Sequence, residues 1–153
     1  MSRSSCIVAS RDGWSASDFH RMCDGKGVTV TFVKSSDGYI FGGYTDVAWG
    51  GEGGVYKSFV ESFMFSLKEH AGIGPVKMPI KSNKTEDAVG HDSCLGPDFG
   101  DGTDLNVASN VNSNTSSFCI VVGEYQLPSN TNDPHFLTGS RNFTLSEYEV
   151  FLV

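Results

Sequence analysis

The chain has 153 residues, of which 39% are hydrophobic and 12% aromatic, and this suffices for the core of one domain. Its 18 glycines and 19% charged residues are typical of a β-rich globular protein with many turns, which argues against a helical bundle or a disordered chain. The net charge of −7 disfavours nucleic acid and anionic membrane surfaces as partners, and no apolar run is long enough to insert into a membrane.

The N-terminal part is predicted to hold a short strand and a helix. The segment 6–10 is apolar and is predicted to be a strand that stops at 11-RDG-13. Ser15 and Asp18 have capping-box spacing, and Phe19, Met22 and Cys23 then share one face of a helix over 15–23. The glycines of 24-DGKG-27 suit the end of that helix.

A β-hairpin follows the helix. The alternating, β-branched segment 28–34 and the aromatic segment 39–45 are predicted to pair through the turn 35-SSDG-38, which carries the Asp-Gly hairpin signature. After the glycine-rich loop 50-GGEGGVYKS-58, the segment 59–68 fits either a buried strand or a helix.

The rest of the chain is predicted to consist of strands joined by polar loops. The three predicted strands are 76–81, 118–125 and a closing strand at 143–153. Together with one clear helix, these segments predict a mainly β (α+β) fold: a two-sheet antiparallel β-sandwich with one or two short flanking helices.

Gly42 and Gly43 stand in the middle of a predicted strand, where glycine weakens pairing and offers no side chain. We expect a bulge there, or a place where another backbone or a bulky side chain approaches.

Asp98, Asp101 and Asp104 recur at every third residue in 96-GPDFGDGTDLNV-107 and are weak candidates for a calcium loop. The EF-hand pattern requires alternating ligands and a distal glutamate, so a glycine-rich turn with solvated or turn-capping aspartates is the favoured interpretation. No metal ion and no cofactor are predicted.

The four cysteines are Cys6, Cys23, Cys94 and Cys119, and they would permit two disulfides in three connectivities. None forms a C-x-x-C pair, and we expect reduced, small core residues. Cys23 lies three residues after His20 and could act with it as a nucleophile, but no group that orients the base is evident. The residues themselves therefore reveal no active site.

Glu149 alternates with Tyr148, Val150 and Leu152 in the closing strand, so it is expected on the opposite sheet face, with Glu147 and Phe151. It is either a solvated strand residue or a buried carboxylate that meets backbone donors or an arginine.

Several motifs occur in an order that resembles the TLDc family, from about residue 6 to the C-terminus. They are 11-RDGWSASDFHRMCDGKG-27, 39-YIFGGYT-45 with Trp49, 63-FMFSL-67, 96-GPDFGDGTDL-105 and 143-FTLSEYEVF-151. The FGGYT and GPDFGDGTDL motifs resemble the invertebrate and protist branch of that family more than the oxidation-resistance proteins.

The resemblance implies a β-sandwich with Gly42, Gly43, Trp49, Gly96, Gly100 and Glu149 as structural signature positions, and Trp49 packed over the end of the sheet. We expect one TLDc-like domain over 1–153, without the N-terminal helical segment that longer members carry. TLDc proteins are named for oxidation resistance, several bind or regulate the vacuolar proton pump (V-ATPase), and no accepted catalytic activity comes with the fold.

The first functional hypothesis is therefore a non-enzymatic protein-interaction module that acts through exposed loops at 46–58 and 96–117, with V-ATPase subunits as a partner. The start MSRSSCIVAS has no apolar signal-peptide core, so as a natural N-terminus it predicts a cytoplasmic protein. A second hypothesis is a calcium-dependent extracellular binding sandwich with glycosylated Asn83, Asn114 and Asn142. A third is an enzyme or redox-reactive protein that acts through Cys23 or Cys119.

Overall fold

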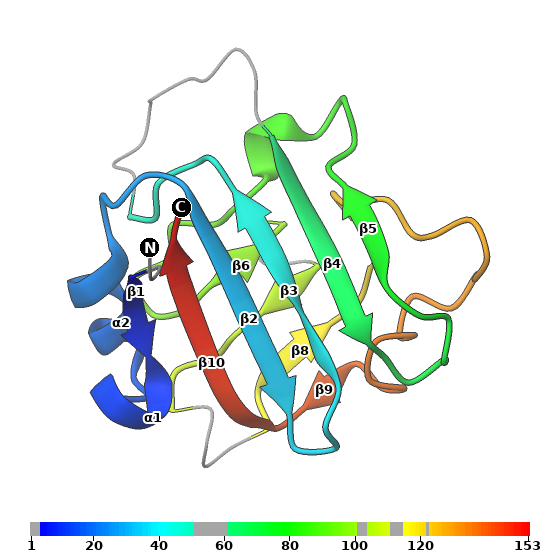
Figure 1. Ribbon diagram of the computed structural model, residues 1–153. Coiled ribbons are helices and arrows are strands. Elements are labelled where there is room, and N and C mark those ends of the chain that lie inside the picture. Colours follow the sequence, from blue (N-terminus) through cyan, green and yellow to red (C-terminus); the bar gives the residue numbers. More distant parts are fainter. Residues whose placement is uncertain (1–3, 51–60, 101–103, 111–114, 122) are drawn as a thin grey trace.

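The protein is a two-layer assembly of antiparallel sheets (Figure 1). The structure, a computed structural model, describes residues 4–50, 61–100, 104–110, 115–121 and 123–153. The larger sheet has the order β1-β10-β2-β3-β4-β5, and the smaller one behind it has the order β6-β7-β8-β9. This confirms the predicted mainly β sandwich.

The larger sheet contains most of the regular strand structure. Its strands are β1 (Ser5–Val8), β2 (Thr29–Ser35), β3 (Ile40–Thr45), β4 (Ser62–Lys68), β5 (Val76–Pro79) and β10 (Leu145–Leu152). β2 and β3 form the predicted hairpin, and its turn closes with a hydrogen bond from Gly38 N to Ser35 O. Gly38 has φ +89, a backbone conformation that glycine adopts without strain. The ambiguous segment 59–68 is a strand from residue 62 onward.

The smaller sheet is built from short strands. They are β6 (Asp98–Phe99), β7 (Leu105–Asn106), β8 (Ser117–Cys119) and β9 (Asn142–Phe143). The predicted long strand at 118–125 is therefore wrong after Cys119. The physical reason is the carboxylate of Asp104, which accepts the backbone N–H groups of Glu124 and Tyr125 at 2.9 and 3.2 Å in place of a strand partner.

Two short helices flank the edge formed by β1 (Figure 1). They are α1 (Ala9–Asp12) and α2 (Ala16–Cys23), and a 3-10 turn, η1 (Thr85–Asp87), lies farther along the chain. The predicted capping box of α2 is confirmed, since Ser15 Oγ accepts from Asp18 N and the Asp18 carboxylate accepts from Ser15 N. The predicted strand at 6–10 ends early, because the Asp12 carboxylate accepts the N–H of Val8 and closes a helical turn.

The core fills the space between the two sheets and α2. Trp49 is 1% exposed, donates its indole N–H to Thr29 Oγ1, and makes edge contacts with the rings of Phe19 and Phe99. Phe41 extends from β3 toward Phe143 of the smaller sheet, with 5.4 Å between ring centroids. These rings join both sheets and the helix into one hydrophobic core.

Cys6 and Cys23 form a disulfide that ties β1 to the end of α2, with 5.4 Å between their Cα atoms. Cys119 is buried and free, and Cys94 is exposed. The expectation of four reduced core cysteines is therefore wrong for Cys6, Cys23 and Cys94. Their spacing along the chain could not reveal the pairing, because it depends on the approach of α2 to the edge strand.

Candidate interaction surface

The larger sheet has an outer face that turns away from the core, and its middle row runs straight across five strands. The cross-strand register aligns Glu149 of β10 with Phe32, Phe32 with Gly42, Gly42 with Phe65 and Phe65 with Lys77 of β5. The row therefore has a carboxylate near one end, an ammonium group at the other, and two phenylalanine rings around a glycine in between. We call the surface formed by this row and its two neighbours the aromatic face.

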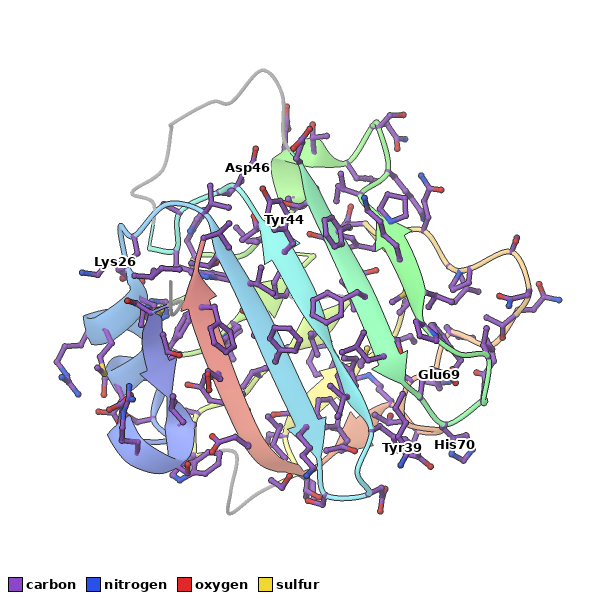
Figure 2. All side chains as sticks on the ribbon, in the orientation of Figure 1. Lys26, Tyr39, Tyr44, Asp46, Glu69 and His70 are labelled. Carbon is purple, nitrogen blue, oxygen red and sulfur yellow. A yellow bond between two sulfur atoms is a disulfide. The ribbon has the colours of Figure 1, made fainter. Side chains whose placement is uncertain are left out.

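A parallel row of the aromatic face lies toward the end of β10. The register aligns Phe151 with Val30, Val30 with Tyr44, Tyr44 with Phe63 and Phe63 with Pro79. Tyr44 is labelled on β3 in Figure 2, where ring side chains cover the middle strands of the sheet.

The aromatic side chains of this face contact one another. Phe32 makes edge contacts with Phe65 and Phe151, with ring centroids 5.2 and 5.6 Å apart, and Tyr44 stacks on Phe63 at 5.0 Å. All five rings are half-buried, so each keeps part of its apolar surface in water. Contiguous exposed apolar surface of this kind marks interaction sites in soluble proteins.

Gly42 leaves room for the rings of Phe32 and Phe65 to meet in the middle of the face. A Cβ at this position would come within 2.9 Å of the carbonyl carbon of Thr31 and 3.2 Å of Phe65 Cζ. Gly42 is buried although it faces outward, because the neighbouring rings cover it. Of the alternatives that the double glycine predicted, both the close approach of another backbone and that of a bulky side chain are present here: the carbonyl of Thr31 and the ring of Phe65.

Charged groups of opposite sign border the aromatic face. On the β10 side, the Glu149 carboxylate accepts a hydrogen bond from Ser5 Oγ at 2.9 Å, and the Glu147 carboxylate accepts from Ser10 N at 3.0 Å. On the opposite side, the ammonium group of Lys77 lies 4.2 Å from the centroid of the Phe63 ring. The third row aligns Glu147 with Lys34, Lys34 with Ile40, and Ile40 with Lys68.

A shallow hollow of about 260 Å³ lies at the basic border of the face. Its lining comes from β4, β5 and the residues next to them: Glu61, Ser62, Phe63, Lys77, Pro79 and Ile80. Toward the other end of β4, Leu67 follows Phe63 and Phe65 at every second residue, on the side of the aromatic face, and is 48% exposed.

The other signature positions lie in the core or support it. A Cβ on Gly43, which faces inward, would lie 2.8 Å from Phe99 Cδ1. Gly96 donates its N–H to Val107 O at 2.8 Å, and Gly100 donates to Ala88 O at 3.0 Å with φ +89. Glu149 is neither fully solvated nor buried: it is half-buried on the aromatic face, with the hydroxyl of Ser5 as a donor.

The two calcium candidates that the structure describes, Asp98 and Asp104, are buried, so the alternative of a turn with solvated aspartates is wrong for them. Asp98 and Asp104 are 2% and 0% exposed, and Asp101 lies outside the described residues. Within the described ranges, no group of three or more His, Cys, Asp or Glu side chains could hold a metal ion. Asp104 instead uses both carboxylate oxygens to hold the backbone at Glu124 and Tyr125.

The predicted cysteine nucleophiles are poorly placed for chemistry. Cys23 is bonded to Cys6, and His20 directs Nδ1 to Asp24 Oδ1 at 2.7 Å and Nε2 to Leu95 O at 2.8 Å. Burial raises the pKa of the Cys119 thiol far above its usual range, and the nearby charge of Asp104 raises it further. A thiol with a raised pKa stays protonated and is a weak nucleophile.

The predicted functional loops contribute little to the described surface. Residues 96–100 and 104–108 are buried and hold β6 and β7, so the expectation of an exposed loop is wrong there; 51–58, 101–103 and 111–114 lie outside the described residues. The aromatic face was missed, although one signal was available. Phe32, Phe63 and Phe65 alternate with inward-facing Val33, Met64 and Ser66, so apolar residues lie on both faces of β2 and β4.

Comparison of the chain with models of known protein families gives a match over nearly its whole length. A family model with the description TLDc domain matches residues 6–153. No curated protein matches the chain. In the part of the chain that the structure describes, no helix is long and apolar enough to cross a membrane.

Proposed function

The chain belongs to the TLDc family, and we propose that it is a non-enzymatic protein-interaction module whose binding surface is the aromatic face. The observation that carries this proposal is the row Phe32–Gly42–Phe65 on a sheet face that none of the described elements covers. Burial of the apolar surface that these half-buried rings still expose favours binding, and aromatic residues are enriched at the centres of protein interfaces.

The partner we propose is a subunit of the V-ATPase, in the cytoplasm and in connection with resistance to oxidation. Family membership supports this partner, because several TLDc proteins bind or regulate that pump. The raised pKa of Cys119 and the buried state of Asp98 and Asp104 support a binding role over a catalytic one.

An affinity pull-down with surface variants tests the proposal. Leu67→Asp combined with Lys77→Glu changes two exposed side chains of the aromatic face, and we expect loss of captured pump subunits. Ser129→Asp combined with Asn130→Asp adds the same type of side chain at exposed positions outside the face and should capture as much as the wild type.

Two results would contradict the proposal. Equal capture by both double variants would show that the aromatic face is not the binding surface. Absence of pump subunits from the wild-type eluate would remove that partner, and other proteins lost specifically with Leu67→Asp/Lys77→Glu would then identify the partner of the face.

The Cys6–Cys23 disulfide favours a second candidate, an extracellular binding sandwich. Disulfides persist mainly in oxidising compartments, where exposed Asn83 and Asn142 of two N-x-Ser/Thr sequons would be open to glycosylation. Peptide mapping of the protein from its own cells, after thiol alkylation and without reductant, distinguishes the two. A Cys6–Cys23 linked peptide with glycan on Asn83 supports this candidate, and free thiols with an unmodified Asn83 support the cytoplasmic one.

A further inference from the structure

We propose that the aromatic face binds a second copy of this chain, sheet against sheet, about a two-fold axis that runs along β3. The proposal rests on the proposed interaction function of the same face, for which the second copy and a pump subunit would compete. It follows from the five strands β10, β2, β3, β4 and β5, which have β3 at their centre, and from the opposite charges that lie two strands away on either side of β3. This placement makes the face complementary to itself.

β3 is the centre of the row Glu149–Phe32–Gly42–Phe65–Lys77. β2 and β4 lie one strand away on either side, and β10 and β5 lie two strands away. Strands are about 4.8 Å apart, so Glu149 and Lys77 lie at similar distances, about 10 Å, from Gly42.

Rotation by 180° about an axis along β3 exchanges the two sides of the face. Gly42 then meets Gly42 of the second copy, and Phe32 meets Phe65 of the second copy. The contact that forms at a two-fold axis is self-complementary, since every pair occurs twice. Two sheets that pack in this way lie about 10 Å apart with nearly aligned strands, so side chains from both faces fill the space between them.

The same rotation pairs opposite charges. Glu149 of β10 comes to lie opposite Lys77 of β5 in the second copy, and Lys77 opposite the second copy's Glu149. Both groups stand beside aromatic rings, where water is displaced on contact and the attraction is stronger than in bulk solvent. An unrelated apolar partner would match the rings equally well, but the charges at both ends of this row favour another copy.

The neighbouring row contains a side chain on β10 and a hollow beside β5 that the rotation brings together. Phe151 of β10 comes to lie opposite Pro79 of β5, which lines the hollow of about 260 Å³ together with Phe63 and Lys77. The walls of the hollow are mixed, with Phe63, Pro79 and Ile80 as the apolar part that a phenylalanine ring can contact. A half-buried phenylalanine that enters such a hollow would serve as an anchor residue of the interface. Tyr44 lies on the axis and meets Tyr44 of the second copy.

The third row of the aromatic face places like charges opposite each other at the margin of the dimer, which weakens it. Lys34 of β2 comes to lie opposite Lys68 of β4 in the second copy, and both side chains are exposed. Like charges in these positions repel, although water screens them at the rim. We therefore expect a concentration-dependent dimer, and we expect Lys68→Glu to strengthen it.

Sedimentation velocity over a concentration series tests the proposal, with two charge reversals as the main variants. We expect wild-type protein to shift from monomer to dimer as concentration rises. Lys77→Glu and Glu149→Lys should each weaken the dimer about tenfold or more, because each reversal acts twice across a two-fold interface. An equimolar mixture of the two variants should recover a dimer, since one face is then basic at both ends and the other acidic.

Matched controls separate interface effects from folding. Lys26→Glu and Glu86→Lys make the same charge changes at exposed positions off the face, and Lys26 is labelled in Figure 2 away from the central strands. Both should dimerise like the wild type. Glu149 accepts a hydrogen bond from Ser5, so Glu149→Lys could also destabilise the fold. If its melting temperature is lowered, Glu149→Gln and Lys77→Glu are used in its place to test the dimer.

Three outcomes would overturn the proposal: a wild-type monomer at every concentration, a dimer that Lys77→Glu leaves unchanged, or a variant mixture that stays monomeric. These outcomes are distinct from failure of the proposed function. A monomer whose partner capture is still lost with Leu67→Asp/Lys77→Glu keeps the aromatic face as a binding surface and removes only the second copy as its occupant.

Discussion

The two faces of the larger sheet come from the same strands and differ in what covers them. On the inner face, Val33, Phe41 and Met64 have no exposed surface, because the smaller sheet packs on them. On the outer face, Phe32 and Phe65 are also apolar but half-buried, and no described element lies over them (Figure 1). The difference shows that hydrophobic content alone does not decide which face of this sheet becomes the core.

The adjacent glycines of β3 lie on different faces of the larger sheet, and different groups occupy the space next to each of them. Gly43 faces inward, and the ring that occupies its side-chain space is Phe99 of the other sheet. Gly42 faces outward, and the groups that occupy its space are the Thr31 carbonyl and the Phe65 ring of its own sheet. Gly43 therefore serves the contact between layers, and Gly42 shapes the surface that we propose as an interface.

The largest expected effect comes from truncation of an inner ring. Phe41→Ala should lower the free energy of unfolding by about 4 kcal/mol, because it removes a fully buried phenylalanine and leaves a cavity next to Phe143. Phe32→Ala on the outer face should cost about 1 kcal/mol, since water can reach the truncated site. Urea denaturation at low protein concentration measures both, and equal losses would break the distinction between the two faces.

Gly43→Val is expected to cost about 3 kcal/mol, since the added methyl groups overlap the Phe99 ring and the core has little room to adjust. The test is a double-mutant cycle with Phe99→Leu, measured by the same denaturation. The smaller side chain should recover about 1 kcal/mol or more as a coupling energy. Strict additivity, or a Gly43→Val protein of unchanged stability, would contradict the assigned contact between the layers.

The fold was largely predictable because its signals are local. The capping box at Ser15 and Asp18, the Asp-Gly turn and the alternation in β2 each specify an element through neighbouring residues. The chain after Cys119 was not predictable in this way. Its apolar residues have strand propensity, but the carboxylate of Asp104, fifteen residues earlier, captures the backbone of Glu124 and Tyr125.

The candidate site was less predictable than the fold. The motif residues Gly42, Gly43 and Trp49 were found, but they were interpreted as architecture only, and function was assigned to the loops. Alignment of Glu149 with Phe32, Gly42, Phe65 and Lys77 depends on the register of four strand pairs, and a shift of one residue in any pair would change it. The Cys6–Cys23 pairing depends in the same way on how α2 meets the edge strand.

Gly42→Ala should lower the stability by about 2 kcal/mol, less than Gly43→Val, and it separates the two glycines most sharply. The added methyl group meets the backbone of Thr31, which cannot move without disturbing the pairing of β2 with β3, and it also meets Phe65 Cζ at 3.2 Å. Phe65→Ala should therefore fail to rescue Gly42→Ala, whereas a smaller residue at Phe99 partly rescues Gly43→Val. Thermal and urea denaturation of the single and double variants measure this. Full recovery in the Gly42→Ala/Phe65→Ala protein would mean that the ring alone excludes a side chain, and the outer glycine would then be a feature of the aromatic face and not of the strand pairing beneath it.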